Sequence, residues 1–118
     1  MTNEKAKIKN IARRADFSEK EIERYLVSKC KAHGWPCLKY SNTSEVGYPD
    51  RLVCLPRYTV CWVELKSKGR QPTKLQKLRH EQLTLSGQQV FIADCKEDID
   101  TLTGILERQT KYCDDNFL

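Results

Sequence analysis

The sequence contains no apolar run long enough to cross a bilayer, and its basic, polar start offers no secretion or membrane address. We therefore expect a cytoplasmic protein with no membrane partner. Internal repeats and low-complexity linkers are also lacking, which excludes repeat architectures. The 118 residues are expected to form one compact domain with a modest core.

Closely spaced ligands of the zinc type are lacking too. None of the six cysteines belongs to a Cys-x-x-Cys pair, and the two histidines, His33 and His80, fall in different predicted helices. A zinc site usually needs such pairs, because a tight turn must direct two sulfurs at one ion. Cys54 and Cys61 lie in apolar strand-like runs, where a free thiol behaves as a small hydrophobe. The cysteines are therefore expected to be reduced and structural.

Acidic residues are missing from one stretch of the chain. Residues 65–80 carry a local charge of +6, while the whole chain has +5. The basic residues of this stretch are Lys66, Lys68, Arg70, Lys74, Lys77 and Arg79. Such a block is typical of a protein that binds a polyanion, although a charge run alone more often marks a solvated helix face. Residues 1–16 are also basic and lack apolar periodicity, so we expect a flexible arm there.

Hydrophobic periodicity and turn residues predict seven elements. They are a helix over residues 19–33, strands over Cys37–Tyr40, Arg51–Leu55 and Thr59–Leu65, a helix that begins after Pro72 and ends at Ser86 and Gly87, a strand over Gln89–Ala93, and a helix over Lys96–Arg108. Phe17 and Ser18 are expected to staple and cap the first helix. The order α-β-β-β-α-β-α predicts an α/β fold with a mixed sheet flanked by helices. The domain would span residues 17–110, before a C-terminal tail over 111–118.

Acidic and basic side chains are predicted to meet at one end of the second and third strands. Asp50 begins one strand, while Glu64 and Lys66 are two residues apart on the next and therefore point to the same face. If the connection between these strands has an odd number of residues, Asp50 lies across from Glu64. An even connection without a bulge would send Asp50 to the opposite face. Glu19 and Glu23 fall on the core-facing half of the first helix, where a carboxylate is costly without a partner.

Two neighbouring carboxylates supply the hard oxygen ligands that Mg²⁺ or Mn²⁺ prefers, and they leave positions for water and for a phosphate oxygen. The backbone carbonyl of Leu65 is a further candidate ligand. Lys66 is suited to orienting or deprotonating the attacking water, or to neutralising charge that develops on the phosphorane. Taken alone, Glu64 and Lys66 have another interpretation, which is an ordinary surface ion pair.

The wider pattern resembles the virus-type replication-repair nuclease (VRR-NUC) domain family of the PD-(D/E)xK, restriction-endonuclease-like superfamily. The resemblance covers about residues 19–104, which is most of the chain. The matching pieces, in chain order, are Gly47-Tyr48-Pro49-Asp50-Arg51, which resembles the G-x-P-D-R element, Val63-Glu64-Leu65-Lys66, which resembles the (D/E)-x-K strand, then Gly69, Gln76, the run from Arg79 to Leu83, Gly87, and the strand from Val90 to Ala93.

This resemblance implies roles for individual residues. Asp50 and Glu64 would be metal ligands and Lys66 the catalytic lysine. Gln76 would face the active site from the first part of the second predicted helix. The basic residues expected to grip the phosphates beside the metal are Lys68, Arg70, Lys74, Lys77 and Arg79. Such contacts position a duplex without reading its sequence.

A glutamate of the first helix would complete the acidic cluster. Glu23 is preferred, because the run Glu23–Val27, with Gly34 after it, is similar to the opening of archaeal Holliday-junction resolvases. Glu19, one turn earlier, is the alternative, because the resemblance to other members of the family implies an acid there. Without a partner in the cluster, Glu19 would only complement the helix dipole.

The resemblance implies a metal-dependent DNA endonuclease with Mg²⁺ or Mn²⁺ and no small-molecule cofactor. Stand-alone members of this size, often phage-encoded, look like homodimers that cut branched DNA, Holliday junctions in particular. Two active sites related by a two-fold axis suit the paired incisions that a junction needs. The alternatives are flap, exonuclease or nicking activity on the same fold, and an inactive DNA-binding module.

Overall fold

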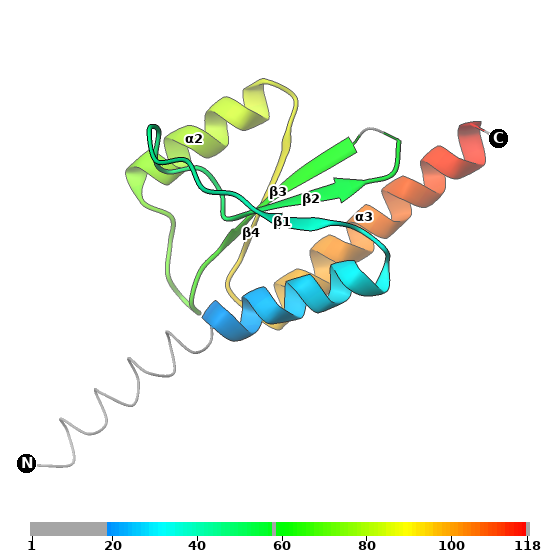
Figure 1. Cartoon of the computed structure of the whole chain (residues 1–118), viewed down its shortest axis with the longest axis horizontal. Coiled ribbons are helices and arrows are strands. Elements are labelled where there is room, and N and C mark those ends of the chain that lie inside the picture. Colours follow the sequence, from blue (N-terminus) through cyan, green and yellow to red (C-terminus); the bar gives the residue numbers. More distant parts are fainter. Residues whose placement is uncertain (1–18, 58, 118) are drawn as a thin grey trace, which may run out of the picture.

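The computed structural model describes residues 19–57 and 59–117, with side chains as far as Lys111. Its elements are an N-terminal helix over residues 19–32, β1 (Cys37–Lys39), β2 (Arg51–Leu55), β3 (Thr59–Leu65), α2 (Lys74–Leu85), β4 (Gln89–Ala93) and α3 (Lys96–Phe117). This succession confirms the predicted order α-β-β-β-α-β-α (Figure 1). The predicted arm over residues 1–16 and the predicted cap residues Phe17 and Ser18 lie outside the described residues.

The four strands form one mixed sheet in the order β1-β2-β3-β4. Strands β1, β2 and β3 pair antiparallel, and β4 runs parallel to β3 after a crossover through α2. The register pairs Leu55 with Thr59, so three residues connect β2 to β3. It also pairs Arg51 with Val63, which brings the next position outward, Asp50, alongside Glu64. The predicted mixed sheet is confirmed, and its register sets the position of the candidate site.

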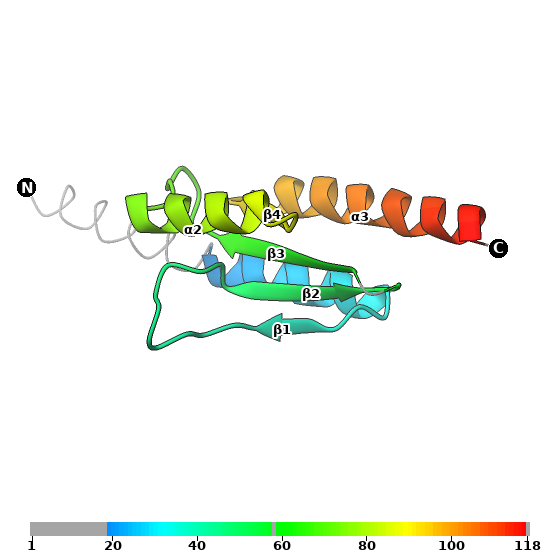
Figure 2. The same ribbon diagram turned by 90° about the horizontal axis from the view of Figure 1, so that it is seen from above.

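One face of the sheet carries the hydrophobic core. Val53, Cys61 and Val63 point to this face and have no exposed surface. Leu26 of the N-terminal helix and Ile99 of α3 belong to the same buried cluster. The N-terminal helix lies along β2 and β3, and α3 runs beside it at the β4 side (Figure 2). This packing fixes the two strands that carry Asp50 and Glu64 at their ends.

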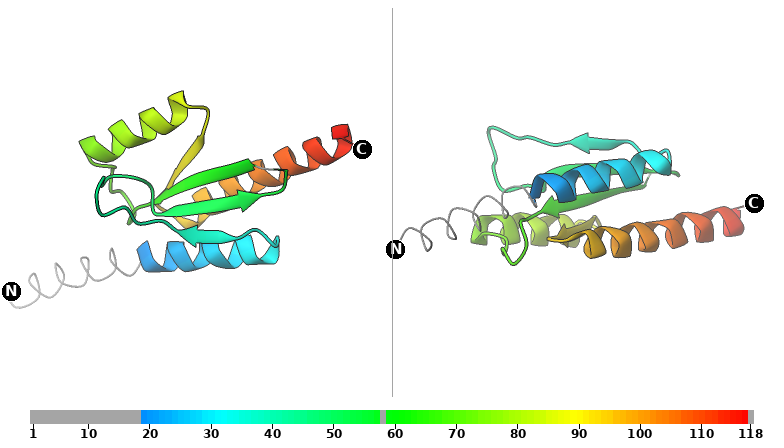
Figure 3. Two further views of the ribbon diagram at one scale, coloured as in Figure 1. Left: turned by 45° about the horizontal axis from the view of Figure 1, so that its top comes forward. Right: turned by 90° about the horizontal axis from the view of Figure 1, so that it is seen from below.

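The opposite face of the sheet is covered only in part, by α2 (Figure 3). His80 is the only buried residue of α2, whereas Leu78 and Leu85 of the same helix are 48% and 80% exposed. Leu38 of β1 and Ile92 of β4 are also exposed on this face. Apolar burial therefore does little to place α2. The helix also contacts β4, and Arg79 and His80 join it to the Val46 carbonyl and to Glu64.

Three element boundaries differ from the prediction. The N-terminal helix ends at residue 32 rather than 33. β1 ends at Lys39 rather than Tyr40, and α3 continues to Phe117 rather than ending near Arg108. The apolar spacing that set the predicted end of α3 stops at Leu106, but no proline or glycine follows to break the helix. α3 therefore extends past the sheet through most of the segment expected to be a tail (Figure 1). Among the described helices, none is long and apolar enough to cross a membrane.

Candidate active site

Asp50 stands immediately before β2, beside the last residues of β3. The three-residue connection between these strands is the odd count that places Asp50 on the side of Glu64. Oδ2 of Asp50 accepts a hydrogen bond of 3.0 Å from the backbone N–H of Leu65. This bond fixes the direction of one carboxylate oxygen at the edge of the hairpin. The structure thus brings Asp50 and Glu64 together as the strand spacing predicted.

The loop that delivers Asp50 is held against α2. Gly47 has a φ of 98°, and a Cβ atom there would lie 2.8 Å from the Cγ of Leu75. Arg79 donates a hydrogen bond of 3.1 Å from Nε to the carbonyl of Val46, and its guanidinium group lies 5.0 Å from the centre of the Tyr48 ring. The glycine is therefore required both for its backbone angle and for the close approach of α2. These contacts explain why a glycine stands three residues before Asp50 in the Gly-x-Pro-Asp element.

The carboxyl group of Glu64 is buried, with only 1% of the residue exposed. Burial, and then the neighbouring Asp50, raise its pKa to about 9, while Lys66 lowers the pKa and Glu19 raises it further. A buried carboxyl group beside a second acid is unfavourable as an anion unless a positive charge is added. The donor set of Glu64 and Asp50 therefore fits a divalent cation with a preference for oxygen ligands.

Two further side chains lie close to Glu64. Lys66, half-buried, is near enough for its charge to lower the pKa of both Glu64 and His80. Nε2 of His80 lies 3.2 Å from Oε1 of Glu64. Burial lowers the pKa of His80 and raises that of Glu64. The sequence did not single out His80 as a functional residue. Its signal was its place in the run from Arg79 to Leu83, which resembles the family pattern but was given no role.

The two glutamates of the N-terminal helix have different surroundings. Oε2 of Glu23 lies 3.5 Å from Nε of Arg51, whose Nη1 also donates to the carbonyl of Cys37. Glu19 has no ion-pair partner among the described residues, and its charge acts on Glu64. Glu23, the glutamate preferred from the sequence, thus serves an ion pair that ties the helix to β2. The alternative, Glu19, faces the acidic cluster.

A cavity of about 500 Å³ opens beside these acids. Its lining residues are Glu19, Lys20, Glu23, Lys39 and Asp50. A larger cleft of about 620 Å³ lies at the other end of the sheet, between the β2–β3 connection and the last turns of α3. No acidic residue lines that cleft. The smaller cavity is therefore the one of the two that carries carboxylates and lysines, and it lies beside Asp50.

Comparison with known proteins assigns the family. A solved structure described as "VRR_NUC domain" superposes with a TM-score of 0.70 and 30% sequence identity, covering 74% of this chain and 95% of that one. "Putative nuclease p44" of Acyrthosiphon pisum secondary endosymbiont phage 1 is 37% identical over 79 residues, which make up 67% of this chain and 85% of that protein. This chain belongs to the VRR_NUC family. No family model matches it. The resemblance stated from the sequence, and the fold that it implied, are confirmed.

Gln76 of this VRR_NUC chain has a structural contact at the start of α2. Its Oε1 accepts a hydrogen bond of 2.9 Å from the N–H of Thr73, and its own N–H donates to Oγ1 of Thr73. Together the two residues form a capping box. Among the residues that the structure describes, Gln76 forms no hydrogen bond with the carboxylates. Its expected place facing the active site therefore stays a prediction.

The basic residues expected to grip phosphates fall into two groups. The exposed ones, without an ion-pair partner among the described residues, are Lys68, Arg70, Lys74 and Lys77. Arg79 is half-buried, and its guanidinium group is already used by the Val46 carbonyl, the Tyr48 ring and Gln82. The first group is available for a polyanion. Arg79 is better described as the residue that holds the loop before Asp50.

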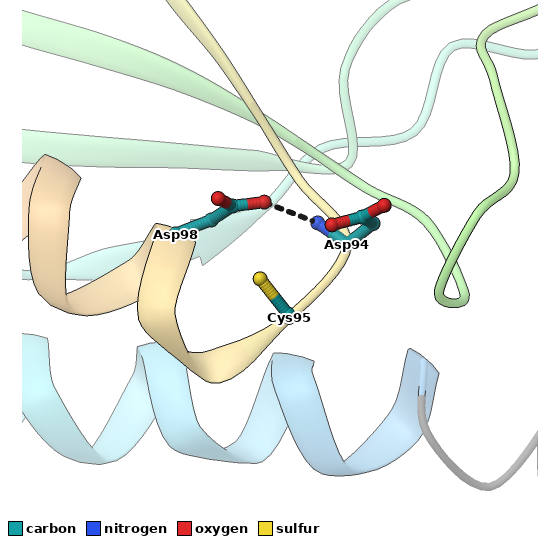
Figure 4. A group of neighbouring side chains, drawn as sticks. All are labelled: Asp94, Cys95 and Asp98. Carbon is teal, nitrogen blue, oxygen red and sulfur yellow. Dashed lines mark hydrogen bonds between the residues drawn. The ribbon is translucent and has the colours of Figure 1, made fainter.

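A second acidic group lies where β4 passes into α3. Asp94, Cys95 and Asp98 place possible ligand atoms within 4.8 Å of one another (Figure 4). Oδ2 of Asp98 accepts from the N–H of Asp94, and Oδ2 of Asp94 accepts from the N–H of Gly69. Carboxylates that accept backbone N–H groups are expected at the start of a helix. In this VRR_NUC chain the group therefore holds the turn between β4 and α3 and the loop after β3.

Proposed function

We propose that this protein is a divalent-metal-dependent DNA nuclease that hydrolyses phosphodiester bonds. The observation that carries the proposal is the buried carboxyl group of Glu64 in contact with Asp50, beside Lys66. A chain that folded only to bind DNA would gain nothing from this arrangement, because burying two acids together costs free energy. Membership of the VRR_NUC family supports the same conclusion.

The residues that would hold the ion are Asp50, Glu64 and the backbone carbonyl of Leu65. When bound, Mg²⁺ or Mn²⁺ would acidify a water molecule and offset negative charge on the phosphate. The Leu65 N–H keeps Asp50 oriented toward the end of β3. Lys66, whose charge acts on Glu64, is placed to orient the attacking water or to neutralise charge on the phosphate.

Glu19 is the better candidate for the third acid of the cluster. Glu19 and Glu23 both line the cavity beside Asp50, but Glu19 has no ion-pair partner among the described residues and its charge acts on Glu64, whereas Glu23 is paired with Arg51. The exposed cations before and on α2 would bind phosphates on either side of the cleaved bond. These cations are Lys68, Arg70, Lys74 and Lys77.

The substrate that we propose is branched DNA, a Holliday junction in particular, cut by a homodimer. This part rests on the resemblance to stand-alone, often phage-encoded members of the family. It is supported by a relative named as a nuclease of a phage. Two sites related by a two-fold axis would make the paired incisions that resolve a junction. A flap, exonuclease or nicking activity is the alternative within the same chemistry.

The test is cleavage of three labelled substrates: a four-way junction, a flap and a linear duplex, each with Mg²⁺ or with EDTA. We expect symmetric nicks in the junction with Mg²⁺ and none with EDTA. Cleavage in EDTA would reject the metal site, and full activity of Asp50→Ala or Lys66→Ala would reject the assigned residues. Light scattering decides the assembly, because a strict monomer would favour a flap or nicking activity. Binding without cleavage under all conditions would indicate an inactive DNA-binding module.

A further inference from the structure

A buried hydrogen bond joins α2 to the candidate site. It connects Nε2 of His80 to Oε1 of Glu64 over 3.2 Å, and the two side chains are 10% and 1% exposed. The residues are 16 positions apart in the sequence and lie on different elements. The bond therefore exists only because the fold brings α2 over the end of β3.

The pattern of burial in α2 differs from that of a helix that packs only for stability, because a histidine is buried while leucines are exposed. α2 carries four leucines, yet two of them, Leu78 and Leu85, are about half or more exposed. The one residue that α2 buries is a histidine. Because a buried polar group is costly without a partner, the sheet must offer one at that point. The partner that it offers is a residue of the site itself.

We propose that His80 is a positioning residue, which holds Glu64 in the orientation that binds the divalent cation. The inference rests on the proposed function, since it assigns Glu64 to the ion. An ionised Glu64 can only accept hydrogen bonds, so Nε2 of His80 then carries the proton and donates it to Oε1. The bond restricts rotation of the glutamate and leaves its other oxygen for the ion. Outer partners of this kind change metal affinity by about 10–100-fold when they are removed.

The neighbours of His80 strengthen this assignment. The start of α2 is tied to the loop before Asp50 through Leu75 and Arg79. The same helix thus contacts the elements that carry both proposed ligands. Among these residues of α2, His80 is the one that forms a hydrogen bond with a proposed metal ligand, Glu64.

The experiment measures Mn²⁺ binding to the free protein by electron paramagnetic resonance of unbound Mn²⁺, without DNA. His80→Leu keeps the volume and removes the donor, whereas His80→Gln keeps an N–H group at similar reach. His33→Leu is the matched control, because His33 bonds Glu107 on α3 instead of a residue of the site. We expect the Kd for Mn²⁺ to rise about 10-fold or more in His80→Leu and to recover largely in His80→Gln. DNA binding in EDTA should not change in either variant.

Thermal unfolding in EDTA separates this role from simple stability. If His80→Leu does not fold, His80→Asn, which is polar but too short to reach Glu64, takes its place with the same expected loss. Native Mn²⁺ affinity in a folded variant without the donor overturns the proposal, and so does an equal loss in His33→Leu. Asp50→Ala separates failure of the His80 proposal from failure of the proposed function. If Asp50→Ala retains both Mn²⁺ binding and cleavage, the proposed metal site is wrong, whatever the His80 variants show.

Discussion

Arg51 holds Glu23, and in doing so leaves Glu19 as the glutamate that faces the acidic cluster. The Nε of Arg51 lies 3.5 Å from Oε2 of Glu23, with the two side chains 15% and 30% exposed. The charge of Glu19, by contrast, reaches Glu64. Two glutamates one helical turn apart thus have separate tasks. One ties the N-terminal helix to β2, and the other adds to the charge that a cation would balance.

Substitution of Glu19 should therefore lower activity, whereas substitution of Glu23 should lower stability. Glu19→Gln is expected to lower metal-dependent cleavage on the order of 100-fold, because it removes an oxyanion from the cluster, with little change in stability. Glu23→Gln is expected to lower the free energy of unfolding by about 1 kcal/mol, because it weakens a partly exposed ion pair, and to keep most of the activity. Denaturant unfolding and single-turnover cleavage measure the two quantities. The reverse result would return the catalytic role to Glu23.

Gly47 offers a test of how the loop before Asp50 is held. Gly47→Ala forces a side chain onto a positive φ and into the Cγ of Leu75, at 2.8 Å, so either α2 or the loop must move. We expect a loss of about 2–4 kcal/mol in stability and a large fall in cleavage, because Asp50 moves with the loop.

Gly87→Ala is the matched control for this glycine. Gly87 also has a positive φ, of 90°, but a Cβ atom there meets nothing within 4 Å. The variant should lose only about 1–2 kcal/mol and retain its activity. If both variants behave alike in the cleavage assay, the contact between the loop and α2 is not what positions Asp50.

The sheet could be predicted from the sequence because its signals are local. Alternating apolar residues and turn residues mark β2, β3 and β4, and the three-residue connection then places Asp50 beside Glu64. α3 was predicted too short because its end depends on a missing helix breaker rather than on apolar spacing. Local patterns thus fix the strands and their register, but only loosely fix where an exposed helix stops.

The helix contributions to the site could not be predicted in the same way. The choice between Glu19 and Glu23 depends on Arg51, which reaches across from another element. The contact of His80 depends on where α2 crosses the sheet. Gln76 forms the capping box of its own helix, and its expected place facing the active site stays a prediction. Periodicity says which residues share one face of a helix. It does not say which of them meets a partner on the sheet.

The pKa of Glu64 predicts how stability depends on pH without metal. Its folded-state pKa, raised to about 9, lies above the ordinary value of 4.5. Such a group stabilises the fold fully below its unfolded pKa, and this contribution is lost as the pH rises toward the folded pKa. In EDTA the wild-type protein should therefore lose stability relative to Glu64→Gln between about pH 5 and pH 9. The gap in Tm should widen by at least about 5 °C over that range.

Glu81→Gln is the control for this pH series. Glu81 is exposed on α2 and undergoes the same chemical change away from the core. Its Tm should stay parallel to that of the wild type at every pH. A Glu64→Gln curve that also stays parallel would show that Glu64 is charged in the metal-free protein. The two neighbouring carboxyl groups would then need another source of positive charge.

Charge reversal of the exposed lysines of α2 should weaken DNA binding to the same extent whatever the sequence or shape of the DNA. Lys74 and Lys77 are exposed, have no ion-pair partner among the described residues, and belong to the acid-free stretch that follows β3. Reversing both to glutamate should weaken binding to junction, flap and duplex by a similar factor. The salt dependence of binding should also become flatter, because fewer counterions are released.

Lys31 provides the comparison for this charge reversal. It is exposed near the end of the N-terminal helix, beside Trp35 and Pro36 and away from the acids. Lys31→Glu changes the net charge without touching α2, so it should leave the slope of log Kd against log salt close to that of the wild type. Equal slopes in the Lys31 and the Lys74/Lys77 variants would mean that DNA senses only the overall charge. A loss confined to one substrate would instead make these lysines readers of DNA shape.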